Sequence, residues 1–308
     1  MKIWEGFDTY KKVRKAVVTT GTFDGVHLGH RKIISRLKEI AIQNKAETVL
    51  ITFHPHPRMV LFPDDHELAL LNSLDEKKEL IAGLGVDHLV IIPFTTEFSR
   101  LSSLEFVRNI LVNKIGTKKL VIGYNHHFGR NREGTFEHLN DFGPLYGFEV
   151  EEIPAQDVDS VEVSSTKIRQ ALHSGNIESA RLYLGYDYFF DAKVVEGHKK
   201  GRELGFPTAN LEIPDPHKLI PANGVYAVTS IVDGKSFKGM MNIGIRPTFN
   251  GKSRVIEAHL FDLDRDLYGE TIRVIFRKRI RDEQKFSGPE ALRKQLILDK
   301  EAVLKTLA

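Results

Sequence analysis

Cysteine is absent from the 308 residues of the chain. This absence excludes disulfide bonds, thiolate catalysis and zinc sites built on thiolates, and it fits a reducing cytosol. No apolar run approaches the length that spans a membrane, and no apolar signal core follows Met1. We therefore expect a soluble, cytoplasmic protein without a membrane partner.

The chain also has little net charge. Lys and Arg number 44 against 41 Asp and Glu, which gives a formal net charge of only +3. This balance suits anionic small molecules and does not call for nucleic acid, because no basic block dominates. A chain of 308 residues is long for one core, so two domains are expected.

A glycine-rich stretch, Gly21–His30, lies between a β-branched run at 17–20 and a helix-patterned segment at 33–41. This order predicts a strand, a turn and a helix start, where backbone N–H groups and the helix dipole face an anion. His27 and His30 add imidazole donors at the same place. We interpret the stretch as a phosphate site. A zinc site of His27, His30, His54 and His56 is a weaker alternative, since these histidines lack a carboxylate or thiolate partner.

Strands alternate with helices over the first half, which predicts a parallel sheet covered on both faces. The expected strands are 17–20, 47–53, 87–92, 119–123 and 148–153, and the expected helices are 75–84 and 103–112, the latter capped by Ser102 or Ser103. The turns at 21–30, 54–58 and 123–129 each follow a strand. They should therefore meet at the carboxyl edge of the sheet, where ligands bind.

A serine-rich helix start follows at 163–169. Ser164 or Ser165 can cap a helix whose first turn presents Lys167 and Arg169, an arrangement that suits a second phosphate contact or an ordinary capped helix. One more short helix is expected at 177–184.

The second half is rich in short strands, expected at 189–195, 225–232, 237–243, 255–261 and 272–280, with a closing helix at about 289–307. Asp233-Gly234 is a hairpin signal, and the spacing predicts a small antiparallel barrel or sandwich. In the stretch 197–210, Lys199, Lys200 and Arg202 can close over phosphates or form a basic surface loop.

Two sets of side chains in this half can carry chemistry. Thr208 and Asn210, two apart on an extended chain, point to the same side and can place oxygens on Mg²⁺. Glu257 and His259 share one face of a strand. An inward Glu257 is a candidate general base, whereas an outward one is a solvated surface residue.

Together these residues resemble the bifunctional bacterial riboflavin kinase/FMN adenylyltransferase family, also called FAD synthetase. The resemblance spans nearly the whole chain, and its marks are the H-x-G-H motif at 27–30, the turn at 53–57, Ser164–Arg169, Gly201–Asn210, 221–226, 242–244 with 247–249, 257–260 and 266–269. H-x-G-H alone marks a superfamily of nucleotidyltransferases. Combined with the G-R-x-L-G-F-P-T-A-N motif of 201–210, it is highly specific.

The resemblance implies an α/β Rossmann-like nucleotidyltransferase domain at 1–185, with a parallel sheet, and a riboflavin kinase-like antiparallel β-barrel with a terminal helix at 186–308. The first would transfer AMP from ATP to FMN, giving FAD and pyrophosphate, and the second would phosphorylate riboflavin to FMN with ATP and Mg²⁺. We expect a monomer or weak homo-oligomer with no nucleic-acid partner. Retention of only one activity, or a flavin-binding regulator, are the alternatives.

The same resemblance assigns roles to residues. The catalytic residues would be His27, His30 and Glu257. ATP phosphates in the adenylyltransferase site would meet Gly21, Phe23, Asp24, Gly25, Ser164, Ser165, Thr166 and Arg169. Its flavin would meet Phe53, Pro55, His56, Pro57, Asn125, His126 and Phe128. The kinase site would use Gly201, Arg202, Gly205, Phe206 and Pro207 for ATP and flavin, with Thr208 and Asn210 on the metal.

Two positions depart from the family pattern. His126 stands in Gly123–Gly129 where an aromatic residue is usual, and His54 stands where an acidic residue is common. An imidazole at 126 is expected to titrate near neutrality. Replacing His126 by Phe should then shift the pH profile of FAD formation.

Overall fold

The computed structural model describes residues 1–64, 68–124, 126–154, 163–197, 201, 204–248 and 251–308. The chain forms two compact units, one of residues 1–70 and 74–164 and the other of residues 71–73 and 165–308. The helices α8 (Ser165–His173) and α9 (Ile177–Leu184) belong to the second unit. The division of the two catalytic domains at residue 185 stays a prediction.

The first unit is built on a parallel sheet, as predicted. Its strands are β1 (Lys2–Glu5), β2 (Ala16–Thr20), β3 (Glu47–His54), β4 (His88–Pro93), β5 (Thr117–Gly123) and β6 (Glu149–Ile153), in the order β1-β4-β3-β2-β5-β6. All neighbouring pairs within this order are parallel. β1 lies outside the sequence-based expectation, because four mostly exposed residues carry no hydrophobic pattern.

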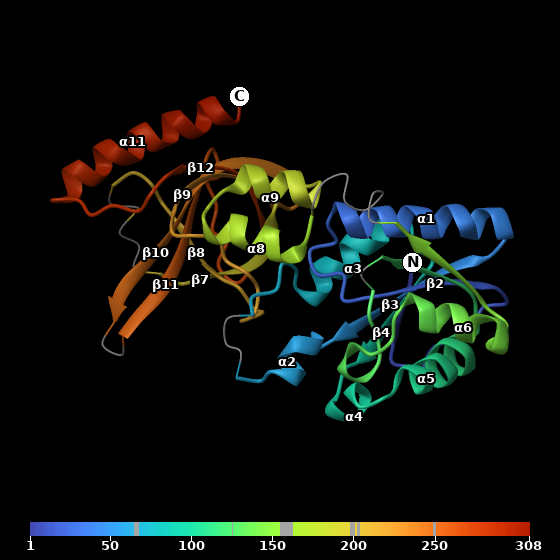
Figure 1. Ribbon diagram of the computed structural model, residues 1–308. Coiled ribbons are helices and arrows are strands. Elements are labelled where there is room, and N and C mark those ends of the chain that lie inside the picture. Colours follow the sequence, from blue (N-terminus) through green and yellow to red (C-terminus); the bar gives the residue numbers. More distant parts are fainter. Residues whose placement is uncertain (65–67, 125, 155–162, 198–200, 202–203, 249–250) are drawn as a thin grey trace. The chain divides into compact units, whose positions relative to one another are not determined.

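Helices cover both faces of this sheet (Figure 1). The helices of this unit are α1 (Leu28–Asn44), α2 (Pro57–Leu61), α3 (Leu74–Gly83), α4 (Thr96–Ser99), α5 (Ser103–Glu105), the π-helix η1 (Phe106–Ile115), the 3₁₀ turn η2 (Arg130–Arg132) and α6 (Phe136–Tyr146). Of these, α1, α3, η1 and α6 contribute buried residues. On one face Val18 and Ile51 pack with Leu111 of η1. On the other, Val17 packs with Leu37 of α1. Alternate residues of the buried strands therefore serve two cores.

The predicted cap of the 103–112 helix is Ser102. Its hydroxyl accepts a hydrogen bond from the Glu105 amide at 3.3 Å, and the Glu105 carboxylate accepts one from the Ser102 amide at 2.9 Å. This reciprocal capping box satisfies two backbone donors at the helix start.

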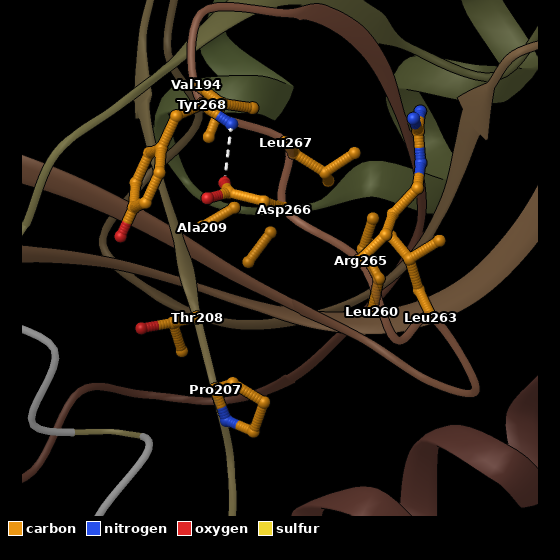
Figure 2. A pocket seen from close by; sticks show the side chains of 11 residues that line it. Val194, Pro207, Thr208, Ala209, Leu260, Leu263, Arg265, Asp266, Leu267 and Tyr268 are labelled. Carbon is orange, nitrogen blue, oxygen red and sulfur yellow. Dashed lines mark hydrogen bonds between the residues drawn. The ribbon is translucent and has the colours of Figure 1, made fainter.

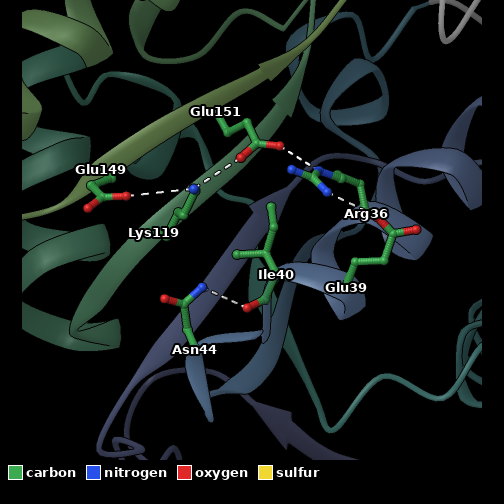
Figure 3. Close-up of polar contacts among 7 residues, drawn as sticks. All are labelled: Arg36, Glu39, Ile40, Asn44, Lys119, Glu149 and Glu151. Carbon is green, nitrogen blue, oxygen red and sulfur yellow. Dashed lines mark hydrogen bonds and ion pairs between the residues drawn. The ribbon is translucent and has the colours of Figure 1, made fainter. Parts of the chain in front are cut away.

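Ion pairs tie α1 to the far edge of the sheet (Figure 3). Arg36 Nε donates to Glu151 at 2.6 Å, and Lys119 Nζ lies 3.0 Å from Glu151 and 3.6 Å from Glu149. These groups are partly exposed, so the network adds little to stability. It joins the helix that begins at the glycine-rich turn to β5 and β6.

The second unit holds the predicted antiparallel barrel, which is closed. Its strands are β7 (Phe189–Val195), β8 (Ala209–Glu212), β9 (Gly224–Val232), β10 (Lys235–Thr248), β11 (Gly251–Leu260) and β12 (Thr271–Arg281), in the order β10-β11-β8-β7-β12-β9. Asp233 and Gly234 turn between β9 and β10 with φ of +49° and +74°, as a two-residue hairpin requires. β8 is an addition to the expected strands; it is only four residues long.

The helix α11 (Pro289–Thr306) packs on the outside of the barrel (Figure 1), where its Val303 joins Ala227, Met240 and Phe261. Arg281 of β12 binds Asp299 of α11 through two hydrogen bonds, of 2.9 and 2.7 Å. Asp299 is 1 % exposed and also accepts from Gln295 at 2.9 Å. The helix is thus fixed to the barrel by an apolar contact and a buried ion pair.

Replacing Asp299 by Ala should lower the free energy of unfolding of the second unit by about 3 kcal/mol, because it leaves the Arg281 guanidinium without its buried partner. Urea unfolding followed by circular dichroism measures the change. Asp282→Ala is the control, since Asp282 meets Arg279 at 2.7 Å on the surface with 82 % of its side chain exposed. Equal stabilities of the two variants would contradict the buried-pair argument.

Candidate active sites

The turn Gly21–His30 connects β2 to α1 as the sequence predicts. Phe23, Gly25 and Val26 have φ of +48°, +88° and +38°. Only glycine adopts this region freely, and for the other two the strain is of order 1–3 kcal/mol each. Strain of this kind persists where the surroundings over-determine the backbone, and it is concentrated at functional sites.

Both histidines of the turn lie at the start of α1. His27 is its N-cap residue with extended backbone, and His30 is in the first turn. Their rings stack with centroids 3.7 Å apart and planes 17° apart. The first turn of α1, which lies wholly in the described part of the chain, carries no acidic side chain. The positive end of the helix dipole is therefore available to an anion.

The His30 ring is a neutral donor site at physiological pH. Burial lowers its pKa well below the ordinary value, and the nearby charges of His27 and Lys77 lower it further. Its Nδ1 has no hydrogen-bond partner among the described residues. A buried nitrogen in this state suits a ligand, because an unsatisfied buried polar atom is costly.

Lys77 of α3 is a residue of this site that the sequence analysis misses. Its side chain is only 6 % exposed, and its Nζ donates to the carbonyl oxygen of Thr22 at 2.8 Å. Burial lowers the pKa of Lys77, whereas the charge of Asp24, itself 2 % exposed, raises it. Lys77 lies four residues before the buried Ile81 and therefore on the same, apolar face of α3. This spacing in the sequence indicates that Lys77 is buried.

The predicted flavin residues lie among aromatic side chains at the carboxyl edge of the sheet. Phe53, at the end of β3, meets Phe98 with ring centroids 5.8 Å apart, and Phe98 continues to Phe106 at 6.3 Å. Phe106 then meets Phe128 at 5.7 Å, and Phe128 stacks with His126 at 6.0 Å. The structure thus links Phe53, Phe128 and His126. Phe98 and Phe106 were not expected, because their positions on α4 and η1 read as core.

The remaining predicted flavin residues have local roles or are not described. His56 is the N-cap of α2 and its Nδ1 accepts from the Arg58 amide at 3.2 Å, with Pro57 as the first helical residue. The peptide bond between His54 and Pro55 is cis. Asn125 lies outside the described residues.

The expectation that His126 titrates near neutrality is wrong. Burial, with smaller effects of the His127 and Arg132 charges, lowers its pKa to about 4. The ring is therefore neutral over the physiological range and is a flat, stacked side chain, like the aromatic residue that it replaces.

The serine-rich segment forms the start of α8, as predicted. Ser164 directly precedes the helix and is exposed, as is Thr166, while Ser165 and Arg169 are partly exposed. Ile168 and Leu172 bury the other face. Because α8 belongs to the second unit, its contact with the phosphates of the first-unit site stays a prediction.

In the barrel, three polar side chains lie in one row. Asn210 of β8 is opposite Glu257 of β11, which is opposite Asn242 of β10. Glu257 and His259 share a face, as predicted, and that face is opposite to the buried Ile256 and Ala258. Glu257 is partly exposed and lines a cavity of ≈ 300 Å³ that also includes Leu292 and Leu296 of α11. It is neither inside the barrel nor a fully solvated surface residue.

A second, smaller hollow of ≈ 90 Å³ lies next to the Asp266–Gly269 mark (Figure 2). Its walls include Leu260, Leu267 and Tyr268, and the Asp266 carboxylate accepts from the Tyr268 amide at 2.9 Å. Thr208 lines both this hollow and the larger cavity. The hydroxyl-bearing residue of the 201–210 motif therefore stands where two binding spaces meet.

His259 fixes the chain that carries Thr208. Its Nδ1 is 2.6 Å from the carbonyl oxygen of Pro207, and its ring meets Phe206 with centroids 5.3 Å apart. Burial lowers the pKa of His259, an effect opposed by its hydrogen bond to Pro207. The neutral ring can donate to this carbonyl through an Nδ1–H group.

Two glycines of the motif occupy positions where another residue would clash or be strained. A Cβ at Gly201 would lie 2.3 Å from the carbonyl oxygen of Phe206, and Gly205 has φ of +81°. Of the predicted basic residues, Lys199, Lys200 and Arg202 lie outside the described residues. Within the described ranges no group of three or more metal-ligating His, Cys, Asp or Glu side chains occurs, so nothing there supports the zinc alternative.

Comparisons with known proteins find a family match for each half of the chain. Residues 9–167 match the family described as FAD synthetase, and residues 184–307 match riboflavin kinase. The bifunctional riboflavin kinase/FMN adenylyltransferase of Escherichia coli strain K12 is 38% identical over 284 residues, 92% of this chain and 90% of its own. The protein of that name in Listeria monocytogenes is 39% identical over 295 residues, 96% of this chain and 93% of its own.

The fold also has a solved relative. A crystal structure described as a macrolide-efflux protein from Streptococcus pneumoniae superposes with a TM-score of 0.89 at 30% identity, over 98% of each chain. None of the helices in the described ranges of our chain combines the length and hydropathy that a membrane crossing requires. With both family matches and near full-length relatives, the chain belongs to the bifunctional riboflavin kinase/FMN adenylyltransferase family, with an N-terminal FAD synthetase domain and a C-terminal riboflavin kinase domain.

Proposed function

We propose that the turn Gly21–His30 binds the triphosphate of ATP for adenylyl transfer. A phosphate oxygen of FMN attacks the α-phosphorus, the bond to the β-phosphate oxygen breaks, and FAD and pyrophosphate form. Gly21, Phe23, Asp24 and Gly25 shape the turn, and the N–H groups of α1 face the phosphates. His27 and His30 donate hydrogen bonds to the oxygens on which charge develops. The stacked pair of histidine rings at a helix start is the observation that supports this assignment.

The flavin of this reaction is proposed to lie against the aromatic side chains at the carboxyl edge. Phe53, Phe128 and His126 present ring faces and edges on which an isoalloxazine can stack. Pro55, His56 and Pro57 would border it on the β3 side, and Asn125, which lies outside the described residues, is proposed as a further contact. Ser164, Ser165, Thr166 and Arg169 are proposed to contact the triphosphate.

In the barrel, we infer that riboflavin occupies the larger cavity and ATP the smaller hollow. The single observation that supports this division is that Thr208 lines both spaces, with Glu257 opening into the larger one. Glu257 takes the proton of the terminal ribityl hydroxyl as that oxygen attacks the γ-phosphorus and ADP leaves. The apolar lining from Leu292, Leu296 and Phe286 suits the flavin ring.

Thr208 and Asn210 fit a magnesium ion by their chemistry. A hydroxyl and an amide oxygen are hard donors of the kind Mg²⁺ takes alongside phosphate oxygens and water, and Asn210 is the cross-strand neighbour of the Glu257 carboxylate. The bound ion would neutralise phosphate charge. Gly201, Gly205, Phe206 and Pro207 shape the loop that carries Thr208, and Arg202 would add a positive charge.

A cytoplasmic location and a monomeric or weakly associated state complete the proposal. Both reactions consume ATP, which is made inside the cell. An enzyme with only one working half, or a flavin-binding regulator, is separated from this proposal by incubating the protein with riboflavin, ATP and Mg²⁺ and measuring FMN and FAD chromatographically. FMN without FAD limits the activity to the barrel, and a protein that makes neither is not an enzyme of this kind.

His30→Ala should lower the rate of FAD formation from FMN about 10²-fold or more, because it removes a donor to the transition-state charge. FMN formation from riboflavin should be unchanged. His138→Ala, at an exposed position on α6, is the control and should affect neither rate. Equal loss of both activities in His30→Ala would contradict the division of the two sites.

Glu257→Gln should have the reverse effect and slow FMN formation by about 10²–10⁴-fold, as expected for loss of a general base. FAD formation should stay normal when FMN is supplied. Glu212→Gln on the neighbouring strand β8 changes an exposed carboxylate in the same way and should be silent. A normal kinase rate in Glu257→Gln would exclude this residue as the base.

His126→Phe should leave the pH profile of FAD formation unchanged above pH 6. The pKa of about 4 means that the wild-type ring carries no proton to lose in this range. Initial rates at saturating ATP and FMN between pH 6 and pH 9 measure the profile. A displaced acid limb in the variant would show that His126 titrates there after all.

A further inference from the structure

The buried lysine Lys77 has a defined task in the fold of the phosphate-binding turn. An ammonium group in the interior is costly unless hydrogen bonds or opposite charge compensate it. Here the compensation comes from the turn itself, because Nζ donates to the carbonyl oxygen of Thr22 at 2.8 Å and the charge of Asp24 favours the ammonium. The side chain of Lys77 is thus directed at the backbone of the Gly21–His30 turn.

The same carbonyl is held from a second side. Thr52, fully buried in β3, donates its hydroxyl hydrogen to the Thr22 oxygen at 3.2 Å. The oxygen is therefore fixed by one donor from α3 and one from β3. The residue that follows, Phe23, is the first of the turn residues with positive φ, at +48°. The two donors act at the entrance to the strained part of the backbone.

We propose that Lys77 is a positioning residue for adenylyl transfer, whose ammonium holds the Thr22 carbonyl and so fixes the turn that presents His27 and His30 to the triphosphate. This inference rests on the proposed role of the turn. Lys77 need not touch the nucleotide, since it acts through the backbone. A conformational constraint of this kind is needed because small misplacements of catalytic groups cost large factors in rate.

The charge of Lys77 supports the same role. Its ammonium is close enough to His30 to help lower the pKa of that ring. Asp24 and His30 are the titratable groups that interact electrostatically with Lys77. The Lys77 charge adds to burial, the main cause of the lowered pKa of His30, while its ammonium restrains the backbone.

The test is Lys77→Met, which keeps the apolar stem and removes the donor and the charge. We expect kcat for FAD formation from FMN and ATP to fall about 10- to 100-fold, with KM for FMN changed less than about threefold. Riboflavin kinase activity of the same protein should be normal. Lys78→Met is the matched control, because Lys78 lies on the same helix but meets Asp75 at 3.2 Å and Glu5 at 3.7 Å near the surface.

Thr52→Val is the second variant and removes the other donor to the Thr22 carbonyl. It should lower kcat in the same direction by a smaller factor, and it decides the question if Lys77→Met does not fold. A kcat within twofold of wild type in Lys77→Met, or in Thr52→Val where the first variant is unfolded, overturns the inference. His30→Ala distinguishes failure of the proposed function of the turn from failure of the positioning role of Lys77. If His30→Ala abolishes adenylyl transfer while Lys77→Met does not, only the positioning role fails.

Discussion

The strained turn between β2 and α1 is the constraint on which the first unit depends. For α1 to point its N-terminus at an anion, the chain must reverse within a few residues of β2, and Phe23 and Val26 adopt unfavourable positive φ to do so. The surrounding structure has to hold this geometry. Buried parallel strands supply a rigid base, and donors from Lys77 and Thr52 fix the Thr22 carbonyl of the turn.

The barrel also holds the backbone beside its candidate site in place, but through other contacts. Of the described motif residues, Gly201, Leu204 and Phe206 line the larger hollow, Pro207 and Ala209 line the smaller one, and Thr208 lines both. His259 holds the Pro207 carbonyl, so that Thr208 stays at the junction of the hollows. The register of β8 with β11 then puts Asn210 beside Glu257. A carboxylate, side-chain oxygen donors and two hollows meet here because three strands share one face.

Hydrophobic periodicity predicted the fold well, because buried strands and amphipathic helices must show it in any sequence. Hydrophobic periodicity does not predict residues whose burial differs from what is usual for their side-chain type. Lys77 reads as a solvated residue in a helix, and only the three-dimensional contact with Thr22 reveals its role. Phe106 is a core residue and Phe98 packs against the same core, but periodicity does not reveal that their rings also link Phe53 to Phe128. β1 and β8 are four-residue strands, too short for a hydrophobic pattern to mark them.

Both proposed sites must bind the negatively charged phosphates of ATP, but they do so with different groups. In the first unit burial lowers the pKa of His30, so in the proposed binding mode the attraction to a triphosphate comes from the helix dipole, backbone N–H groups and the Lys77 charge behind the turn. The barrel row of Asn210, Glu257 and Asn242 contains no cation. Oxygen donors beside a carboxylate suit a metal ion better than a phosphate, which agrees with the magnesium ion proposed for this site.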